Sequence, residues 1–150
     1  MLLPNGHLKI AIELEPLARE LVTNQDWNAL DALAKQWLSP TGKLHDTLSK
    51  HCTFDSIEHI LALREAPDDE GIWHDDGSRL MAFSLSLTLN HEAVQGGEIM
   101  LREKGLENGL SYPTQPWGTL IIFNTGRDGY EHRVSAIYAG KRLVLAGWCS

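Results

Sequence analysis

The chain lacks the features of a membrane-spanning or secreted protein. No run of 18 apolar residues occurs in its 150 residues, so we expect no transmembrane helix and no membrane partner. The opening segment, MLLPNGHLKIAIELE, has no basic stretch followed by a long apolar run, so no signal peptide is expected. Only two cysteines occur, Cys52 and Cys149, which is too few for a disulfide framework. We therefore expect free thiols in a reducing cytoplasm.

Positive charge is also scarce. The sequence has 13 Lys and Arg against 20 Asp and Glu, a formal net charge of -7. A negatively charged chain is repelled by a phosphate backbone, so we expect no nucleic-acid partner. A length of 150 residues suffices to bury a core, and the natural interpretation is a single domain covering residues 1–150.

The N-terminal third, about residues 1–55, is predicted to be mainly helical. Residues 7–15 alternate between apolar and polar and predict a strand, and residues 16–24 suit a helix that begins with a proline. Asp26 is a plausible N-cap for a second helix over residues 26–38. One face of that helix carries the apolar side chains of Trp27, Leu30, Leu33 and Trp37.

The remainder, about residues 56–150, is predicted to form a β core. Its short β-type runs are IEHILALR, GIWHDD, LMAFSLSLTLN, GEIML, GTLIIFN, HRVSAIY and KRLVLAGW. Several short strands separated by turn residues predict a sandwich or barrel. Along residues 83–90, apolar side chains alternate with small polar ones. We expect the apolar set to pack on the helices or a second sheet, while the polar set either lines a cavity or faces solvent.

A candidate metal site is formed by His74 and Asp76 together with His132. On a strand, residues two apart point to the same side, so His74 and Asp76 could bind one metal, although a polar pair at a strand end is the simpler alternative. Two His and one carboxylate on one side of an iron form the facial triad of non-heme Fe(II) oxygenases. Three ligands leave room for a 2-oxo acid and O2, and Arg142 could clamp a distal carboxylate through two parallel hydrogen bonds.

From about Ile72 to Trp148, the sequence resembles the 2-oxoglutarate/Fe(II)-dependent oxygenases, specifically their prolyl-4-hydroxylase-like branch. The motifs that carry this resemblance are, in order, His74-x-Asp76, the run Arg79 to Asn90, Gly96-Gly97-Glu98, Pro116 to Phe123, His132-Arg133-Val134, Gly140-Lys141-Arg142 and Trp148. Each motif is weak alone, and their common order supplies the context that a lone match lacks.

The resemblance implies a fold that is mainly β with N-terminal helices, a double-stranded β-helix or jelly roll. It implies that His74, Asp76 and His132 are the Fe(II) ligands and that Arg142 binds the far carboxylate of 2-oxoglutarate. O2 would be the second cosubstrate, and ascorbate a candidate reductant. Thr88 stands where relatives often have a Tyr that hydrogen-bonds the same carboxylate, and its hydroxyl can still donate such a bond.

The implied activity is that of a dioxygenase that hydroxylates a C–H bond of a peptidyl or small-molecule substrate and releases succinate and CO2. Two alternatives remain open. One is a non-catalytic jelly-roll module that binds a metal or a 2-oxo acid. The other is a cupin-like metal protein, although the His-x-His motif of cupins is absent. The chain also departs from many relatives at Leu61 to Arg64, where they carry a Tyr.

Two further segments of the sequence are candidates for contact with a substrate. The acidic run at residues 68–70 is either a lip that attracts a cationic substrate or a solvated loop. Arg127 and Tyr130 lie in the loop that leads to His132, where they could contact substrate.

Overall fold

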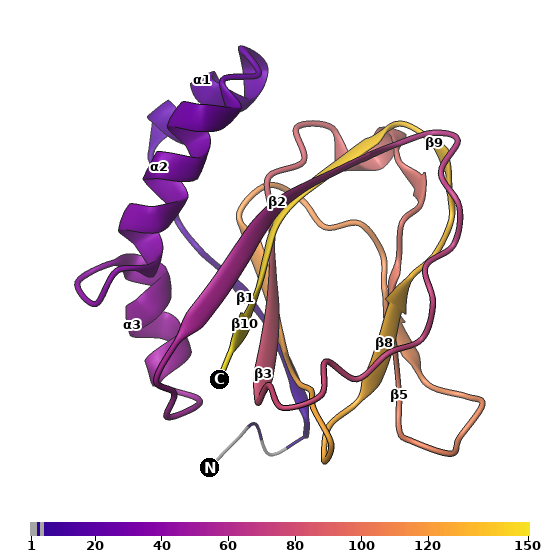
Figure 1. The fold of residues 1–150 in the computed structure, drawn as a ribbon. Coiled ribbons are helices and arrows are strands. Elements are labelled where there is room, and N and C mark those ends of the chain that lie inside the picture. The colour runs from indigo at the N-terminus through magenta and orange to yellow at the C-terminus, as the bar shows by residue number, and fades with distance from the viewer. Residues whose placement is uncertain (1–2, 4) are drawn as a thin grey trace.

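The computed structural model describes residue 3 and residues 5–150, and its helices lie on one side of a β core (Figure 1). The helices are α1 (Pro16–Thr23), α2 (Trp27–Leu38) and α3 (Lys43–Ser49), with a short 3-10 turn η1 at His91–Ala93. The strands are β1 (His7–Ala11), β2 (Ile57–Glu65), β3 (Met81–Ser86), β4 (Gln95–Gly96), β5 (Ile99–Arg102), β6 (Leu110–Tyr112), β7 (Thr119–Asn124), β8 (Glu131–Val134), β9 (Ile137–Ala139) and β10 (Lys141–Cys149).

The first two helices occur where the sequence predicts them. The side chain of Asp26 accepts a hydrogen bond from the Ala29 amide at 3.2 Å, which confirms it as the N-cap of α2. The sequence does not predict helix α3, because the turn residues before it, Ser39 to Gly42, indicate only the end of α2. Its signal is a pair of leucines four residues apart, Leu44 and Leu48, both fully buried.

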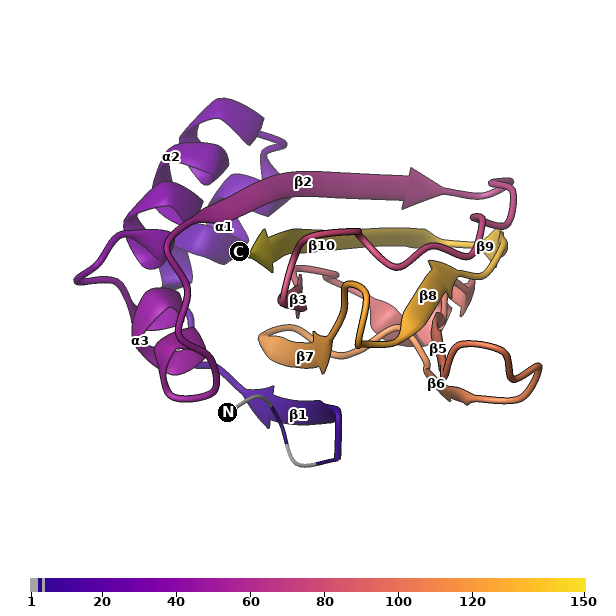
Figure 2. The ribbon, with the colours of Figure 1, turned by 60° about the horizontal axis from the view of Figure 1, so that its bottom comes forward.

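The strands form two antiparallel layers, which confirms the predicted jelly roll. A five-stranded sheet has the order β1-β7-β3-β10-β2. The opposite layer consists of the pair β4-β9 and the three-stranded sheet β6-β5-β8. Figure 2 shows these layers nearly edge-on, with the helices packed against one end and the outer side of the larger sheet.

Strand β3 separates the core from the interior of the barrel. Phe83 and Leu85 belong to the apolar cluster that also contains Leu30 of α2. Ser84 and Ser86 point to the other face, where they line a small cavity, and both are buried. The polar residues of this strand therefore line a cavity and do not face solvent. The helices cover the larger sheet from outside and leave its inner face free to form a site.

Two expectations from composition can be compared with this structure. No helix in the described part of the chain is both long and apolar enough to cross a membrane. Cys52 and Cys149 are buried free thiols, as expected, and burial raises the pKa of Cys149 to about 12. Both cysteines are therefore packing residues and poor nucleophiles at neutral pH.

The packing of α2 on the larger sheet predicts a large loss of stability when its central side chain is removed. Leu30 is fully buried, so Leu30→Ala should lower the free energy of unfolding by about 2–5 kcal/mol, through lost burial and the cavity left behind. Asn28→Ala, at an exposed position on the same helix, should change it by less than about 0.5 kcal/mol. Urea unfolding followed by circular dichroism measures both values, and similar losses would contradict the packing described.

Candidate active site

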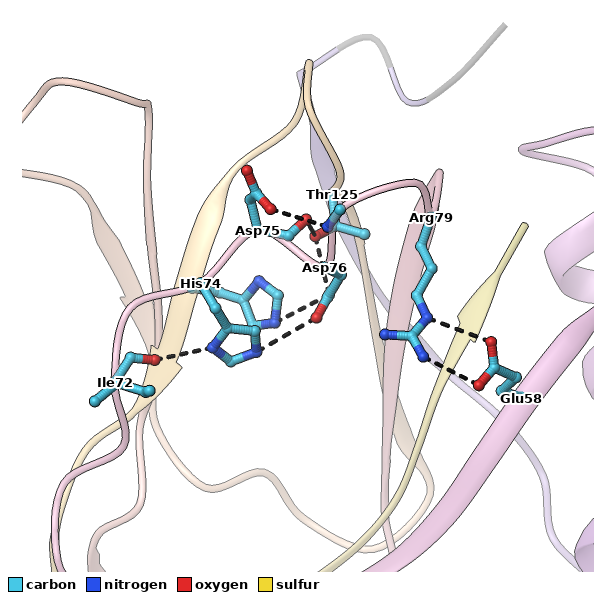
Figure 3. A network of polar contacts seen from close by, with 9 residues as sticks. Glu58, Ile72, His74, Asp75, Asp76, Arg79 and Thr125 are labelled. Carbon is cyan, nitrogen blue, oxygen red and sulfur yellow. Dashed lines mark hydrogen bonds and ion pairs between the residues drawn. The ribbon is translucent and has the colours of Figure 1, made fainter.

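The structure brings His74, Asp76 and His132 together, and Figure 3 shows the side chain of Asp76 directed toward His74. One potential ligand atom from each of the three residues lies within 4.8 Å of the others. The two oxygens of Asp76 face different histidines: Oδ1 is 3.4 Å from His74 Nε2, and Oδ2 is 3.2 Å from His132 Nε2. Two imidazole nitrogens and one carboxylate thus converge on one point.

The backbone reaches this arrangement by a route that the sequence did not predict. The segment around His74 is not a strand: in it, only His74 forms a bridge, an isolated one with His132. Their amides and carbonyls pair in both directions, at 3.1 and 2.9 Å. Asp76 then adopts a left-handed conformation with φ of 62°. The expectation of two residues on one side of a strand is therefore wrong, and a tight turn brings the carboxylate back toward the imidazoles.

Hydrogen bonds around His74 and Asp76 fix the orientation of these two side chains. His74 Nδ1 lies 2.9 Å from the Ile72 carbonyl oxygen. A carbonyl can only accept, so Nδ1 carries the hydrogen and leaves the Nε2 lone pair directed at Asp76. The hydroxyl of Thr125 lies 3.0 Å from Asp76 Oδ2 and 2.9 Å from the Asp75 carbonyl, which anchors the turn.

Electrostatics indicate that this group suits a cation. The Asp76 side chain is only 3% exposed, and no Lys or Arg pairs with it anywhere in residues 5–150. Burial lowers the pKa of His132 to about 4 despite the nearby carboxylate, so this imidazole is neutral at physiological pH. A buried carboxylate without a counter-charge is unfavourable. Two imidazole donors and this carboxylate therefore fit a divalent metal ion.

The two histidines line a cavity of about 190 Å³ that reaches Arg142 at the start of β10. Most of the remaining wall is apolar, including Ile60, Phe123 and Trp148. Beyond Arg142 a much smaller cavity continues toward Ser84, Ser86, Thr114 and Gln115. The interior between the two layers thus has histidines at one place and a guanidinium at another, with apolar walls between them.

Arg142 is buried without a counter-ion. It is 4% exposed, and within the described part of the chain its guanidinium forms no ion pair or side-chain hydrogen bond. Burial, and next the charge of Arg64, lower the pKa of Arg142 to about 10, so it remains charged at neutral pH. A guanidinium offers five N–H donors in a planar fork that matches a carboxylate. The cavity is therefore built to receive an anion.

The position of Thr88 does not support the role expected for it. Its hydroxyl donates to the Leu143 carbonyl at 3.0 Å and accepts from the Leu143 amide at 3.1 Å. Thr88 lines a separate groove beside the helices, together with Trp27 and Leu63. Strand β3 ends at Ser86, so the alternation that directs Ser84 and Ser86 into the barrel does not extend to Thr88.

Other sequence candidates lie away from the cavity or are already neutralised. Asp68 and Glu70 of the acidic run pair with arginines at 2.8 and 2.9 Å, so they form no free acidic lip. Arg127 and Tyr130 line a different groove, of about 490 Å³, that contains neither metal-site histidine. The sequence did not predict a role for Arg64, which lines the same cavity as His74, His132 and Arg142.

Comparisons with known proteins bear on the fold. No family model and no curated protein matches the sequence. Among solved structures, a prolyl-4-hydroxylase from Pseudomonas putida is 23% identical, with a TM-score of 0.65 over 96% of this chain and 87% of its own. A Trichoplax adhaerens prolyl hydroxylase, in complex with a hypoxia inducible factor oxygen degradation domain peptide fragment, is 17% identical, with a TM-score of 0.66 over 97% and 84%.

A third similar structure is the viral collagen prolyl hydroxylase from Paramecium Bursaria Chlorella virus-1 in its 2OG complex. It is 16% identical, with a TM-score of 0.61 over 95% of this chain and 94% of its own. These likenesses extend over nearly the whole of each chain. The protein therefore has the double-stranded β-helix fold of the prolyl hydroxylases, with its N-terminal helices included.

Proposed function

We propose that the protein is an Fe(II)- and 2-oxoglutarate-dependent dioxygenase that hydroxylates a C–H bond. The observation that carries this proposal is that two imidazoles, which adjoin a buried carboxylate, share one cavity with the buried and unpaired Arg142. The metal-site residues suit a divalent ion, and the guanidinium suits the far carboxylate of a 2-oxo diacid. The prolyl hydroxylase fold supports the same assignment.

The chain's own residues would bind and orient the reactants. His74, Asp76 and His132 would hold Fe(II) from one side, and Arg142 would bind the C5 carboxylate of 2-oxoglutarate. When bound, Fe(II) with 2-oxoglutarate and O2 supplies the oxidising chemistry that hydroxylates the C–H bond, with release of succinate and CO2. The apolar walls would exclude water from the reacting groups. Ascorbate would be a candidate reductant.

The substrate is proposed to be peptidyl or a small molecule. One similar structure is a prolyl hydroxylase in complex with a peptide fragment, which supports the peptidyl choice. We further propose that residues 1–150 act as one domain, because the helices pack on the sheet that forms the wall of the cavity. The two free thiols suit a reducing compartment such as the cytoplasm.

The direct test is turnover of 2-oxoglutarate. The native protein with Fe(II), O2 and a panel of peptides and amino acids should release succinate, and one panel member should stimulate that release. Asp76→Ala should abolish it, because the iron then loses its only carboxylate ligand. Detection of succinate by mass spectrometry decides the matter. Absence of succinate from native protein that binds both iron and 2-oxoglutarate would instead favour a non-catalytic binding module.

Iron binding provides a second test that needs no substrate. Native protein should bind one Fe(II) per chain in an anaerobic titration, and His132→Ala should lose this stoichiometric binding because it removes one of three protein ligands. The matched control is His59→Ala, since His59 pairs with Asp31 outside the cavity, 2.8 Å away. The control should bind iron as the native protein does. Stoichiometric iron in His132→Ala would rule out the proposed triad.

The role of Arg142 predicts a large loss of cosubstrate affinity. Breaking a buried charge pair typically costs about 3–5 kcal/mol, and each 1.4 kcal/mol is about tenfold, so Arg142→Ala should weaken 2-oxoglutarate binding by roughly 100-fold or more. Arg142→Lys should fall between, because it keeps the charge and loses the fork. The charge-transfer absorbance of the anaerobic Fe(II) form measures the affinity.

Two controls accompany this measurement. Lys141→Ala removes the neighbouring cation, whose side chain is 62% exposed, and should leave the affinity for 2-oxoglutarate nearly unchanged. Iron stoichiometry should stay at one in every variant, because neither residue faces the metal as a ligand. Equal affinities in native and Arg142→Ala protein would remove the cosubstrate assignment while leaving a metal site.

A further inference from the structure

Arg64 faces Arg142 directly across the ladder between β2 and β10. The two residues are partners in the antiparallel register, and both line the cavity that contains His74 and His132. Residues directly opposite each other in such a ladder have Cβ atoms about 4.5–5.5 Å apart and share one face of the sheet. Two guanidinium side chains therefore enter the same cavity from adjacent strands.

Like charges in directly opposite positions destabilise a sheet unless an anion compensates for them. Asp68 Oδ2 lies 2.8 Å from Arg64 Nε, and the Asp69 carbonyl accepts from Arg64 Nη2 at 2.9 Å. Among the described residues, the Arg64 guanidinium donates only these two hydrogen bonds. Its Nη1 therefore remains free to donate. Asp68 thus compensates Arg64 alone, and the two arginines together carry one uncompensated positive charge, that of Arg142.

We propose that Arg64 is a second anchor for the distal carboxylate of the cosubstrate and forms a two-arginine clamp with Arg142. This inference rests on the proposed function. The clamp makes the cavity selective for 2-oxo acids that carry a second carboxylate. Two arginines, Asp68, Asp76, a divalent metal ion and a doubly ionised 2-oxo diacid together have no net charge, whereas a 2-oxo monoacid leaves one positive charge uncompensated in a largely apolar cavity.

The charge balance also defines the chemical class of the substrate. With the diacid bound, the cavity has no charge left to neutralise, and the rest of its wall is apolar, as at Ile60 and Trp148. An additional charged group would enter without a partner, which is unfavourable in a site of low polarity. The substrate group that approaches the metal is therefore uncharged.

A purely structural role for Arg64 makes a different prediction. In that case, Arg64 only fastens residues 66–70, through Asp68 and Asp69, to the end of β2, and this segment leads to His74. Removing either Arg64 or Asp68 would then have the same effect on the binding of 2-oxo acids. In a clamp the two sides differ, because Asp68→Asn leaves the guanidinium in place and removes its competitor, whereas Arg64→Gln removes the guanidinium itself.

The experiment titrates 2-oxoglutarate and 2-oxobutyrate, which lacks the distal carboxylate, into the full chain loaded with Mn(II), by calorimetry. Arg64→Gln should weaken 2-oxoglutarate binding about tenfold, the size expected for a partly exposed charge-assisted contact, and leave 2-oxobutyrate binding nearly unchanged. Asp68→Asn should bind 2-oxoglutarate as tightly as native protein or more tightly. Arg64→Lys should recover part of the loss.

The outcomes distinguish a failure of the two-arginine clamp from a failure of the proposed function. If native protein binds 2-oxoglutarate but Arg64→Gln keeps the native ratio of the two affinities, the clamp is wrong and the proposed function stands. If Arg64→Gln and Asp68→Asn weaken both acids equally, Arg64 is only a structural fastener. If native protein binds Mn(II) but neither acid, the cosubstrate assignment and the clamp fail together. Equal Mn(II) stoichiometry in all variants shows that each one has folded around its metal site.

Discussion

Strand β10 is the element on which the rest of the structure depends, because it pairs along most of its length with β2 on one side and β3 on the other. These two ladders determine which side chains share the interior of the barrel. They place Arg142 beside Arg64 near one end of β10 and Trp148 near the other. One strand thereby fixes the distance between the guanidinium end of the cavity and its apolar wall.

The metal-site residues depend on a different kind of support. Their positions rest on an isolated bridge, a left-handed residue and the Thr125 hydroxyl, and not on a continuous ladder. Three polar side chains at short mutual distances are unfavourable in an apolar interior, and the hydrogen bonds to His74 and Asp76 offset part of that cost. The guanidinium end is built on regular sheet, whereas the metal end is built on turns next to that sheet.

This division explains how much the sequence could predict. Alternation along β3 and the cap at Asp26 are local patterns, so the strand, the helix and their buried faces were foreseeable. The order of motifs was enough to single out His74, Asp76, His132 and Arg142. Local patterns do not contain the turn at Asp76 or the end of β3. For that reason the strand interpretation of residues 74–76 was wrong, and the position of Thr88 does not support the role expected for it.

Arg64 was missed for a related reason. Its proximity to Arg142 depends on the register of two strands separated by most of the β core, and no spacing in the sequence reveals it. The signal that could have found it is chemical: an arginine near the end of the predicted strand that precedes the His-x-Asp pair.

The location of β2 at the edge of the larger sheet has a consequence for how this protein can diversify. Ser84 and Ser86 of β3 line the interior from a strand whose other face packs on the helices, so enlarging either residue would disturb two layers at once. Ile60 of β2 lines the larger cavity beside the histidines and is 49% exposed, so a change in its size can be accommodated toward solvent at the edge of the sheet. Substitutions at this edge position can therefore change the shape of the cavity with less disturbance of the packing than substitutions at Ser84 or Ser86.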